Sequence, residues 1–344
     1  MQARRGETRI MPRGKVARLA ASQRPTSPPH ARLAPPDLAL ILAVVVVWGF
    51  SFVPIKVALR DAPPFALVAL RFFFAAVPLV FFVPRPRLPV ASIVAYGLAI
   101  GFFMFGLLFL GMNLGMPAGL SSIVIQVQVF FTIGLGVAFL GERLRAENVL
   151  GGLVATLGIA VLALYKIRGG AESTFEGLAA VIVAAFAWAA GNIVAKRAAE
   201  RHEPDMFALV VWSSLVPPLP LLAVSYAFEG GPRVFDAIAH ASLLTWGCLL
   251  FLAYVATLFG FASWARVMHR YPAALVAPFA LLIPVSGLAS GVLFLGETLA
   301  PLQAAGVVLV LVALVVNVYG ARLRGPRRVD AAREGASAPI RERL

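Results

Sequence analysis

A few strongly polar side chains stand inside long apolar stretches of this sequence, where they are costly and therefore mark candidate functional sites. Arg71 lies about eight residues into such a stretch, roughly 12 Å deep at 1.5 Å per residue. Its guanidinium stays charged, and its planar fork suits a carboxylate. The functional interpretation is a cavity residue that holds the carboxylate of an amino acid. The structural alternative is an arginine that snorkels or bonds backbone carbonyls.

Two tryptophans and three amides stand in similar surroundings. Trp48 and Trp188 lie at mid-stretch, either as packing residues or as the wall of an apolar cavity. Gln126 and Gln128 are about 200° apart on an ideal helix, so we expect them not to share a face. At least one of the two glutamines should face a cavity or another helix. The alternative for both is a structural role, in which the amide joins two helices, and the same two interpretations apply to Asn192.

Charged residues at the ends of the apolar stretches form a second group of candidates. Lys56 and Lys196 could snorkel to the interface or pair with acids at a gate. Glu142 and Glu297 are the only acids near apolar segments at matching places in both halves. They could carry a coupling proton, or they could cap the helices that follow them. All sixteen acids lie in tails, loops or stretch ends, and none lies at mid-stretch.

The elements that must position these residues are transmembrane helices. Of the 344 residues 60% are hydrophobic and only 13% are charged, which excludes an ordinary soluble enzyme, a disordered chain and a disulfide scaffold. Apolar stretches of about twenty residues predict an all-α integral membrane protein with ten spans. These are 38–58, 64–83, 90–113, 117–140, 146–165, 176–198, 205–228, 241–265, 272–295 and 301–320.

The positive charge is concentrated at the two ends of the chain. Residues 1–36 carry +7 and residues 321–344 carry +4 of the formal +14, which predicts two basic cytoplasmic tails, the first of them disordered. Connections on the same side hold eight arginines, against four basic residues on the other. We therefore expect both ends inside the cell, and no nucleic-acid binding, because no recognition module accompanies the charge.

An internal repeat divides the chain into halves at 37–165 and 176–320. Residues 117–164 align with 272–319 at an offset of 155, and both copies read F-L-G-E-x-L between apolar spans. Because each half has five helices, the two copies should cross the membrane in opposite senses. Such an inverted repeat is typical of transporters, in which a central site opens to either side in turn.

The motifs that carry a family resemblance are W-G-F-S-F-V-P-I-K-V at 48–57, R-F at 71–72, P-A-G-L at 117–120 and F-L-G-E-R-L at 139–144. With the second F-L-G-E, they resemble the EamA-type drug/metabolite transporter superfamily over roughly 38–320. The runs P-A-G-L-S-S-I-V-I-Q-V-Q-V-F-F-T-I at 117–133 and W-A-A-G-N-I at 188–193 are similar to its cysteine and O-acetylserine exporter subgroup.

The resemblance implies a central cavity and secondary active export of small metabolites by alternating access. A broad amino-acid, nucleoside or drug exporter and a non-coupled facilitator are the alternatives within transport; a membrane-embedded enzyme or a channel is the rival class. The expected location is the cell membrane, plasma or bacterial inner, with the lipid bilayer and a small-molecule substrate as partners and a homodimer as one alternative for assembly.

No catalytic constellation, nucleotide-binding loop, cofactor motif or metal-ligand pattern is found in the sequence.

Overall fold

The computed structural model describes residues 33–142, 144, 146–167, 174–202, 205–271 and 276–323, and these residues are helical apart from short connections. The predicted tails lie largely outside the described residues. The first half contains α2 (Pro35–Phe50), α3 (Phe52–Ala58), α4 (Pro64–Ala76), α5 (Val90–Tyr96), α6 (Phe105–Asn113), α7 (Ala118–Val124), α8 (Gln128–Leu140) and α9 (Ala146–Ile167). The second contains α10 (Phe175–His202), α11 (Met206–Ser213), α12 (Pro218–Phe228), α13 (Arg233–Ala239), α14 (Leu243–Leu250), α15 (Gly260–Arg270), α17 (Leu282–Leu295) and α18 (Pro301–Leu323).

Eight stretches of the described chain are long and apolar enough to cross a bilayer. Two shorter apolar helices, Pro64–Ala76 and Phe279–Leu295, stand where the second and ninth spans are predicted. The second predicted span is too long, because α4 ends at Ala76 and the chain continues to Val83 as consecutive turns. Pro78 explains this end, since proline lacks the N–H that would continue the helix.

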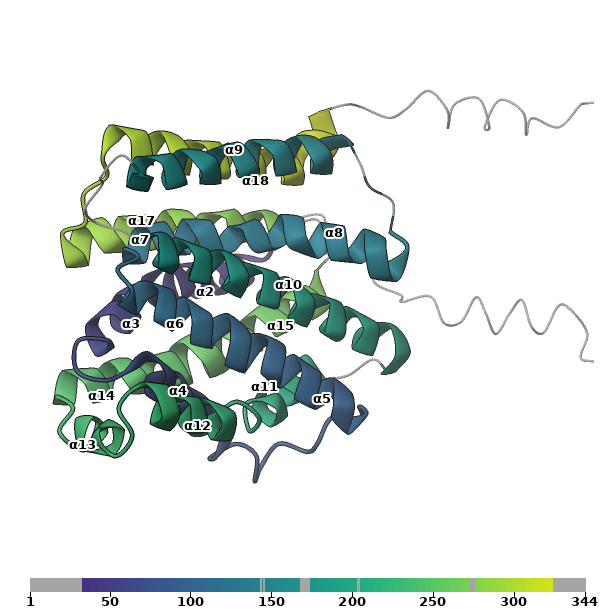
Figure 1. Cartoon of the computed structure of the whole chain (residues 1–344). Coiled ribbons are helices and arrows are strands. Elements are labelled where there is room, and N and C mark those ends of the chain that lie inside the picture. The colour runs from purple at the N-terminus through teal and green to yellow at the C-terminus, as the bar shows by residue number, and fades with distance from the viewer. Residues whose placement is uncertain are drawn as a thin grey trace, which may run out of the picture.

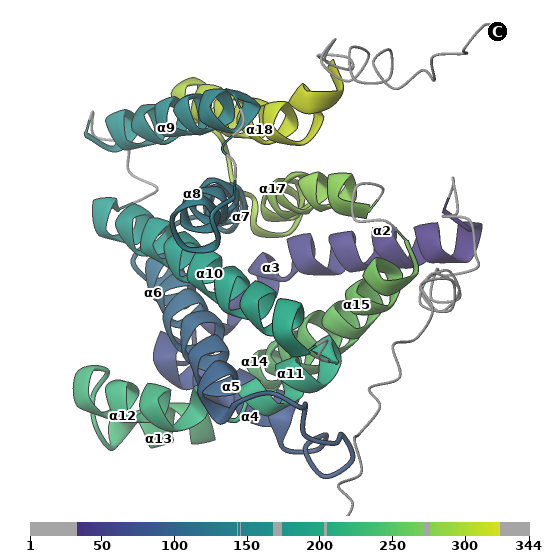
Figure 2. The same cartoon turned by 90° about the vertical axis from the view of Figure 1, so that its right-hand side faces the viewer.

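The helices form an outer layer and an inner group. The long helices α9 and α18 pack side by side and lie outside α8 and α17 in both views (Figures 1 and 2). They meet at Gly158 and Gly306, where a Cβ on either glycine would lie within about 3 Å of the other's carbonyl oxygen. Paired apolar helices of this kind cover the inner group on one side.

Inside this layer two sets of helices face each other (Figure 2). One set consists of α2, α3, α14, α15 and α17, and the other consists of α6, α8 and α10. The helices α4 and α12 pack against each other beneath them. Each facing set therefore combines helices from both halves of the sequence.

Small residues allow helices of the two halves to approach closely. A Cβ on Gly49 of α2 would lie 2.7 Å from the backbone nitrogen of Gly287 in α17, and a Cβ on Gly287 would lie 2.4 Å from the side chain of Ser122 in α7. Membrane helices that approach this closely gain packing and backbone contacts that larger residues would prevent.

We predict that Gly287→Val destabilises the protein, because the added side chain has no room between α17 and α7. Overpacking of this kind costs about 1–3 kcal/mol. The matched control is Gly134→Val, since nothing lies within 4 Å of a Cβ on Gly134. Thermal unfolding in detergent should show a lower midpoint for Gly287→Val alone; equal midpoints for the two variants would contradict this packing.

Candidate functional site

The spans that surround the centre of the molecule are interrupted at mid-depth. The first span breaks at Ser51, between α2 and α3, because Pro54 cannot donate the hydrogen bond that would continue the helix through Phe50. The third and eighth spans contain π-helical segments at Gly97–Met104 and Phe251–Phe259. The fourth and ninth contain 3₁₀ turns at Ile125–Val127 and Ala277–Leu281. Such local departures from α-helix are frequent at functional sites.

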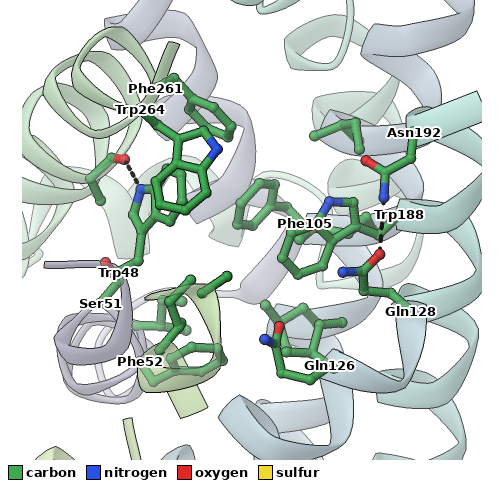
Figure 3. Close-up of a pocket in the computed structure, with 18 of the residues that line it drawn as sticks. Trp48, Ser51, Phe52, Phe105, Gln126, Gln128, Trp188, Asn192, Phe261 and Trp264 are labelled. Atoms are coloured by element: carbon green, nitrogen blue, oxygen red, sulfur yellow. Dashed lines mark hydrogen bonds between the residues drawn. The ribbon is translucent and has the colours of Figure 1, made fainter. Parts of the chain in front are cut away.

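A cavity of about 310 Å³ lies among these breaks. One wall, from the first and eighth spans, carries the aromatic residues Trp48, Phe261 and Trp264 (Figure 3). The facing wall, from the third, fourth and sixth spans, carries Phe105, Gln126, Gln128, Trp188 and Asn192 (Figure 3). All six residues expected at a cavity line it together: Trp48, Arg71, Gln126, Gln128, Trp188 and Asn192.

Arg71 supplies the charge of the cavity. Its side chain is only 3% exposed. Its Nη2 and Nε lie 3.0 and 3.3 Å from the hydroxyl oxygen of Thr257, which itself donates to the carbonyl of Leu252. The guanidinium carbon lies 4.0 Å from the ring centre of Phe105. The buried Nη1 has no hydrogen-bond partner in the described part of the chain. Arg71 therefore neither snorkels nor bonds carbonyls, and the two N–H groups of its buried Nη1 are left without a partner.

The aromatic wall is fixed by the irregular backbone behind it. The indole nitrogen of Trp48 donates to the carbonyl of Ala256 at 2.8 Å. That carbonyl is available because the N–H of Gly260 bonds Val255 and Thr257 instead. The ring of Trp48 also contacts the rings of Phe261 and Trp264, with centres 5.3 and 5.4 Å apart. Trp48 is thus both held by a structural bond and exposed to the cavity.

The opposite wall presents amides. Asn192 donates from Nδ2 to the Oε1 of Gln128 at 2.9 Å and to the hydroxyl of Thr132 at 3.2 Å. Gln126 lines the cavity without a hydrogen bond to any described residue. The expectation that the two glutamines cannot share a face is wrong. Both line the same cavity. The 3₁₀ turn at Ile125–Val127 has about three residues per turn, so the two side chains are about 120° apart the short way round, against about 160° on an ideal α-helix.

The repeated F-L-G-E motif forms the same local structure twice. Gly141 and Gly296 end their helices in the left-handed region, at φ +67° and +65°, which glycine adopts without strain. The next N–H, from Glu142 or Glu297, returns to the carbonyl of Gly136 or Gly291 at 3.2 Å. This turn places each glutamate beside the end of its own helix, from which the side chain can reach the other half.

The two glutamates then bind different partners. The carboxylate of Glu297 accepts hydrogen bonds from the N–H groups of Ala118 and Gly119, at 2.5 and 2.8 Å, at the start of α7. It therefore caps a helix of the other half and not the helix that follows it, where Gln303 accepts from the N–H of Ala300. Lys56 donates to the carbonyl of Met112 at 2.8 Å. Its ammonium group also interacts electrostatically with the carboxylate of Glu297.

Two further carboxylates join the halves at this same end. Glu229 accepts from the N–H of Phe65 at 3.0 Å, at the start of α4. Asp61 accepts from the N–H and hydroxyl of Ser242 and from the hydroxyl of Thr245, at the start of α14. The hydrogen bonds from Ser242 and Thr245 lower the pKa of Asp61. We call this region, whose carboxylates join the two halves, the Glu297 end.

The opposite end, which we call the Lys196 end, is more open. Glu142 forms an ion pair with Lys196, and these side chains are 39% and 48% exposed. Arg270 pairs with Asp37 at 2.9 Å, and the hydroxyl of Tyr271 donates to the same carboxylate at 2.8 Å. The hydrogen bond to Asp37 raises the pKa of Arg270. Glu142 and Glu297 therefore have matching turns but unequal exposure.

The sequence alone does not single out Thr257, Trp264 or the caps Asp61 and Glu229. Thr257 could have been noticed as a hydroxyl within an apolar span, but its bond to Arg71 joins residues 186 positions apart. The two caps depend on contacts between the halves that no local pattern encodes.

Apolar spans that surround a small cavity, whose mostly apolar lining carries a few polar side chains, are the construction of a membrane transporter. Residues 36–164 and 175–319 each match the EamA-like transporter family, and the chain belongs to that family. It is a multi-pass membrane transporter and not an enzyme.

Two relatives carry the name probable amino-acid metabolite efflux pump. The one from Salmonella typhimurium is 43% identical, over 86% of this chain and 98% of the relative. The one from Escherichia coli is 42% identical, over 86% and 99%. A solved crystal structure, 20% identical with a TM-score of 0.57, covers 84% of this chain and 99% of its own, and shares the fold.

We predict that Glu297→Gln loosens the Glu297 end, because an amide cannot accept from both N–H groups without presenting its own N–H₂. Bonds to a charged acceptor contribute about 1.5–3 kcal/mol. Labelling of Met116→Cys, in a chain with Cys248→Ser, by a soluble thiol reagent should therefore accelerate about tenfold or more. Glu176→Gln, an exposed acid at the same end, serves as the control. Unchanged labelling in Glu297→Gln would refute the cap as a seal.

Proposed function

We propose that this transporter exports amino-acid metabolites, most specifically small amino acids and derivatives such as cysteine and O-acetylserine, by alternating access. The observation that carries the proposal is the buried guanidinium of Arg71, which lines the central cavity with one nitrogen unpartnered. A carboxylate would satisfy that nitrogen and neutralise the charge. Every free amino acid and most amino-acid derivatives carry such a group.

The size of the cavity and the relatives support the same class of substrate. A volume of about 310 Å³ lies at the lower end of the range for ligand sites, which favours small metabolites over drug-sized molecules. Both relatives described above are named for amino-acid metabolite efflux. Together these observations favour a small-metabolite exporter over the broad-specificity alternative.

The transport cycle that we propose uses ten spans as an inverted repeat of five plus five, with both ends of the chain in the cytoplasm. The Glu297 end, where hydrogen bonds join the halves, then faces outward, and the more exposed Lys196 end faces the cytoplasm. In this proposal the conformation is poised to take up substrate for export. Since no acid lies at mid-span, a coupling proton must be carried by Glu142, by Glu297 or by the substrate's amine.

The topology predicts which positions a membrane-impermeant thiol reagent can reach in intact cells. After replacement of Cys248, a cysteine at Ala171 should be labelled, whereas cysteines at Ala3 and Ala336 should react only after the cells are opened. These three positions lie outside the described residues. Labelling at either tail position in sealed cells would overturn the inward placement of both ends.

The carboxylate-binding role predicts a graded loss of export at Arg71. Arg71→Ala removes the charge and the fork and should reduce efflux most, while Arg71→Lys keeps the charge but loses the planar fork. Thr257→Val should also reduce efflux, because it removes the hydroxyl that orients the guanidinium; Thr257→Ser should not. Efflux from preloaded cells and growth under toxic concentrations of single metabolites measure the effect.

The control is Arg87→Ala, an exposed connection residue, and the amount of each variant in the membrane is measured alongside. Normal export by Arg71→Ala, or its complete absence from the membrane, would refute the cavity-site role.

A further inference from the structure

The cavity contains a positive charge with no negative charge to balance it. Arg71 is the only charged residue among the described side chains that line it. Five acids that join the halves near the ends of the spans are each held elsewhere: Asp37 by Arg270, Asp61 by Ser242, Glu142 by Lys196, Glu229 by the N–H of Phe65 and Glu297 by the N–H groups of α7. An ammonium group in the cavity therefore meets no carboxylate.

The amide groups in the cavity are neutral and can both donate and accept hydrogen bonds. Gln126 is only 4% exposed and makes no hydrogen bond within the described chain. The Nδ2 of Asn192 is used by Gln128 and Thr132, so its Oδ1 remains as an acceptor. Figure 3 shows these amides on the wall opposite Trp48 and Trp264. An amide both accepts and donates, so it can bond an ammonium, an acylated nitrogen or a hydroxyl alike.

We propose that this cavity selects its substrates by a single carboxylate and does not require a charged amine. It should accept monocarboxylates that are zwitterionic or carry an acylated, uncharged nitrogen, and it should exclude molecules with an additional cationic group. The proposal rests on the carboxylate-binding role of Arg71 and adds the substrate class that the unbalanced charge allows.

The physical reason is the difference between a fixed charge and a neutral wall. In a site of low dielectric, Arg71 attracts one carboxylate strongly and repels any second cation. N-acylation removes a cation that no group in the cavity neutralises, while the amide wall can still bond the acylated nitrogen. Neutralising the amine of the substrate should therefore cost little affinity, whereas neutralising its carboxylate should cost much.

The test measures ligand binding to the purified full-length protein in reducing buffer. Binding is detected as quenching of the fluorescence of the cavity tryptophans. The probes are L-cysteine, N-acetyl-L-cysteine and L-cysteine methyl ester. A second pair, S-propyl-L-cysteine and S-(2-aminoethyl)-L-cysteine, has nearly the same shape and differs by one positive charge. The proteins are the wild type and Arg71→Gln.

The N-acetyl compound should bind the wild type within about threefold of cysteine. The methyl ester should bind about tenfold more weakly or worse, because it has no carboxylate for Arg71. The aminoethyl compound should bind about tenfold more weakly or worse than its propyl partner, because its second cation is repelled by Arg71. In Arg71→Gln the penalty for the aminoethyl group should largely disappear, which a purely steric effect would not produce.

The outcomes separate this proposal from the proposed function. If the N-acetyl compound binds about tenfold more weakly than cysteine while the ester is also rejected, the amine is required and this inference fails, but the carboxylate role stands. A persistent aminoethyl penalty in Arg71→Gln also overturns it. If the ester binds as well as the acid, or no compound binds at millimolar concentration, the carboxylate-binding role of Arg71 fails as well.

Discussion

In a bilayer every backbone polar group must find its partner within the protein, and this constraint determines how the cavity can exist. A cavity needs helices that bend or break, and each break leaves carbonyls without an N–H. Here Trp48, which lines the cavity, supplies one such partner, because its indole donates to the carbonyl of Ala256. The hydroxyls of Ser51 and Thr257 donate to the carbonyls of Val47 and Leu252, and the Val47 carbonyl also accepts from the N–H of Ser51. Side chains at the irregular segments therefore add hydrogen bonds to the backbone around the cavity.

Thr257 connects this backbone constraint to the charge of the cavity. Its hydroxyl hydrogen is committed to the Leu252 carbonyl of the π-helical segment, so its oxygen can only accept, and it accepts from Arg71. The irregular helix thus fixes the guanidinium in one orientation, with Phe105 beside it and Nη1 unpartnered. An unpaired buried charge is costly. The protein tolerates that cost where, in the proposed function, the substrate supplies the missing partner.

The sequence predicted which polar residues line the cavity better than it predicted how the backbone arranges them. Polar residues are so costly in apolar spans that Arg71, Gln126, Gln128 and Asn192 could be selected one by one, and all four line the same cavity. The geometry failed where an ideal helix was assumed, at the 3₁₀ turn between the glutamines. The shortness of α4 was overlooked because apolar composition continues past Pro78. Whether these residues bind substrate stays a prediction.

The two F-L-G-E turns have nearly the same structure, but their glutamates bind different partners at the two ends of the molecule. Glu142 and Glu297 leave the same left-handed glycine and return the same N–H to the preceding turn. Local sequence therefore cannot explain why one carboxylate caps α7 while the other pairs with an exposed lysine. The difference must arise from how the two sets of helices sit against each other. In a cycle that exchanges the shapes of the halves, the same turns would serve both conformations, because each needs only a new partner and not a new fold.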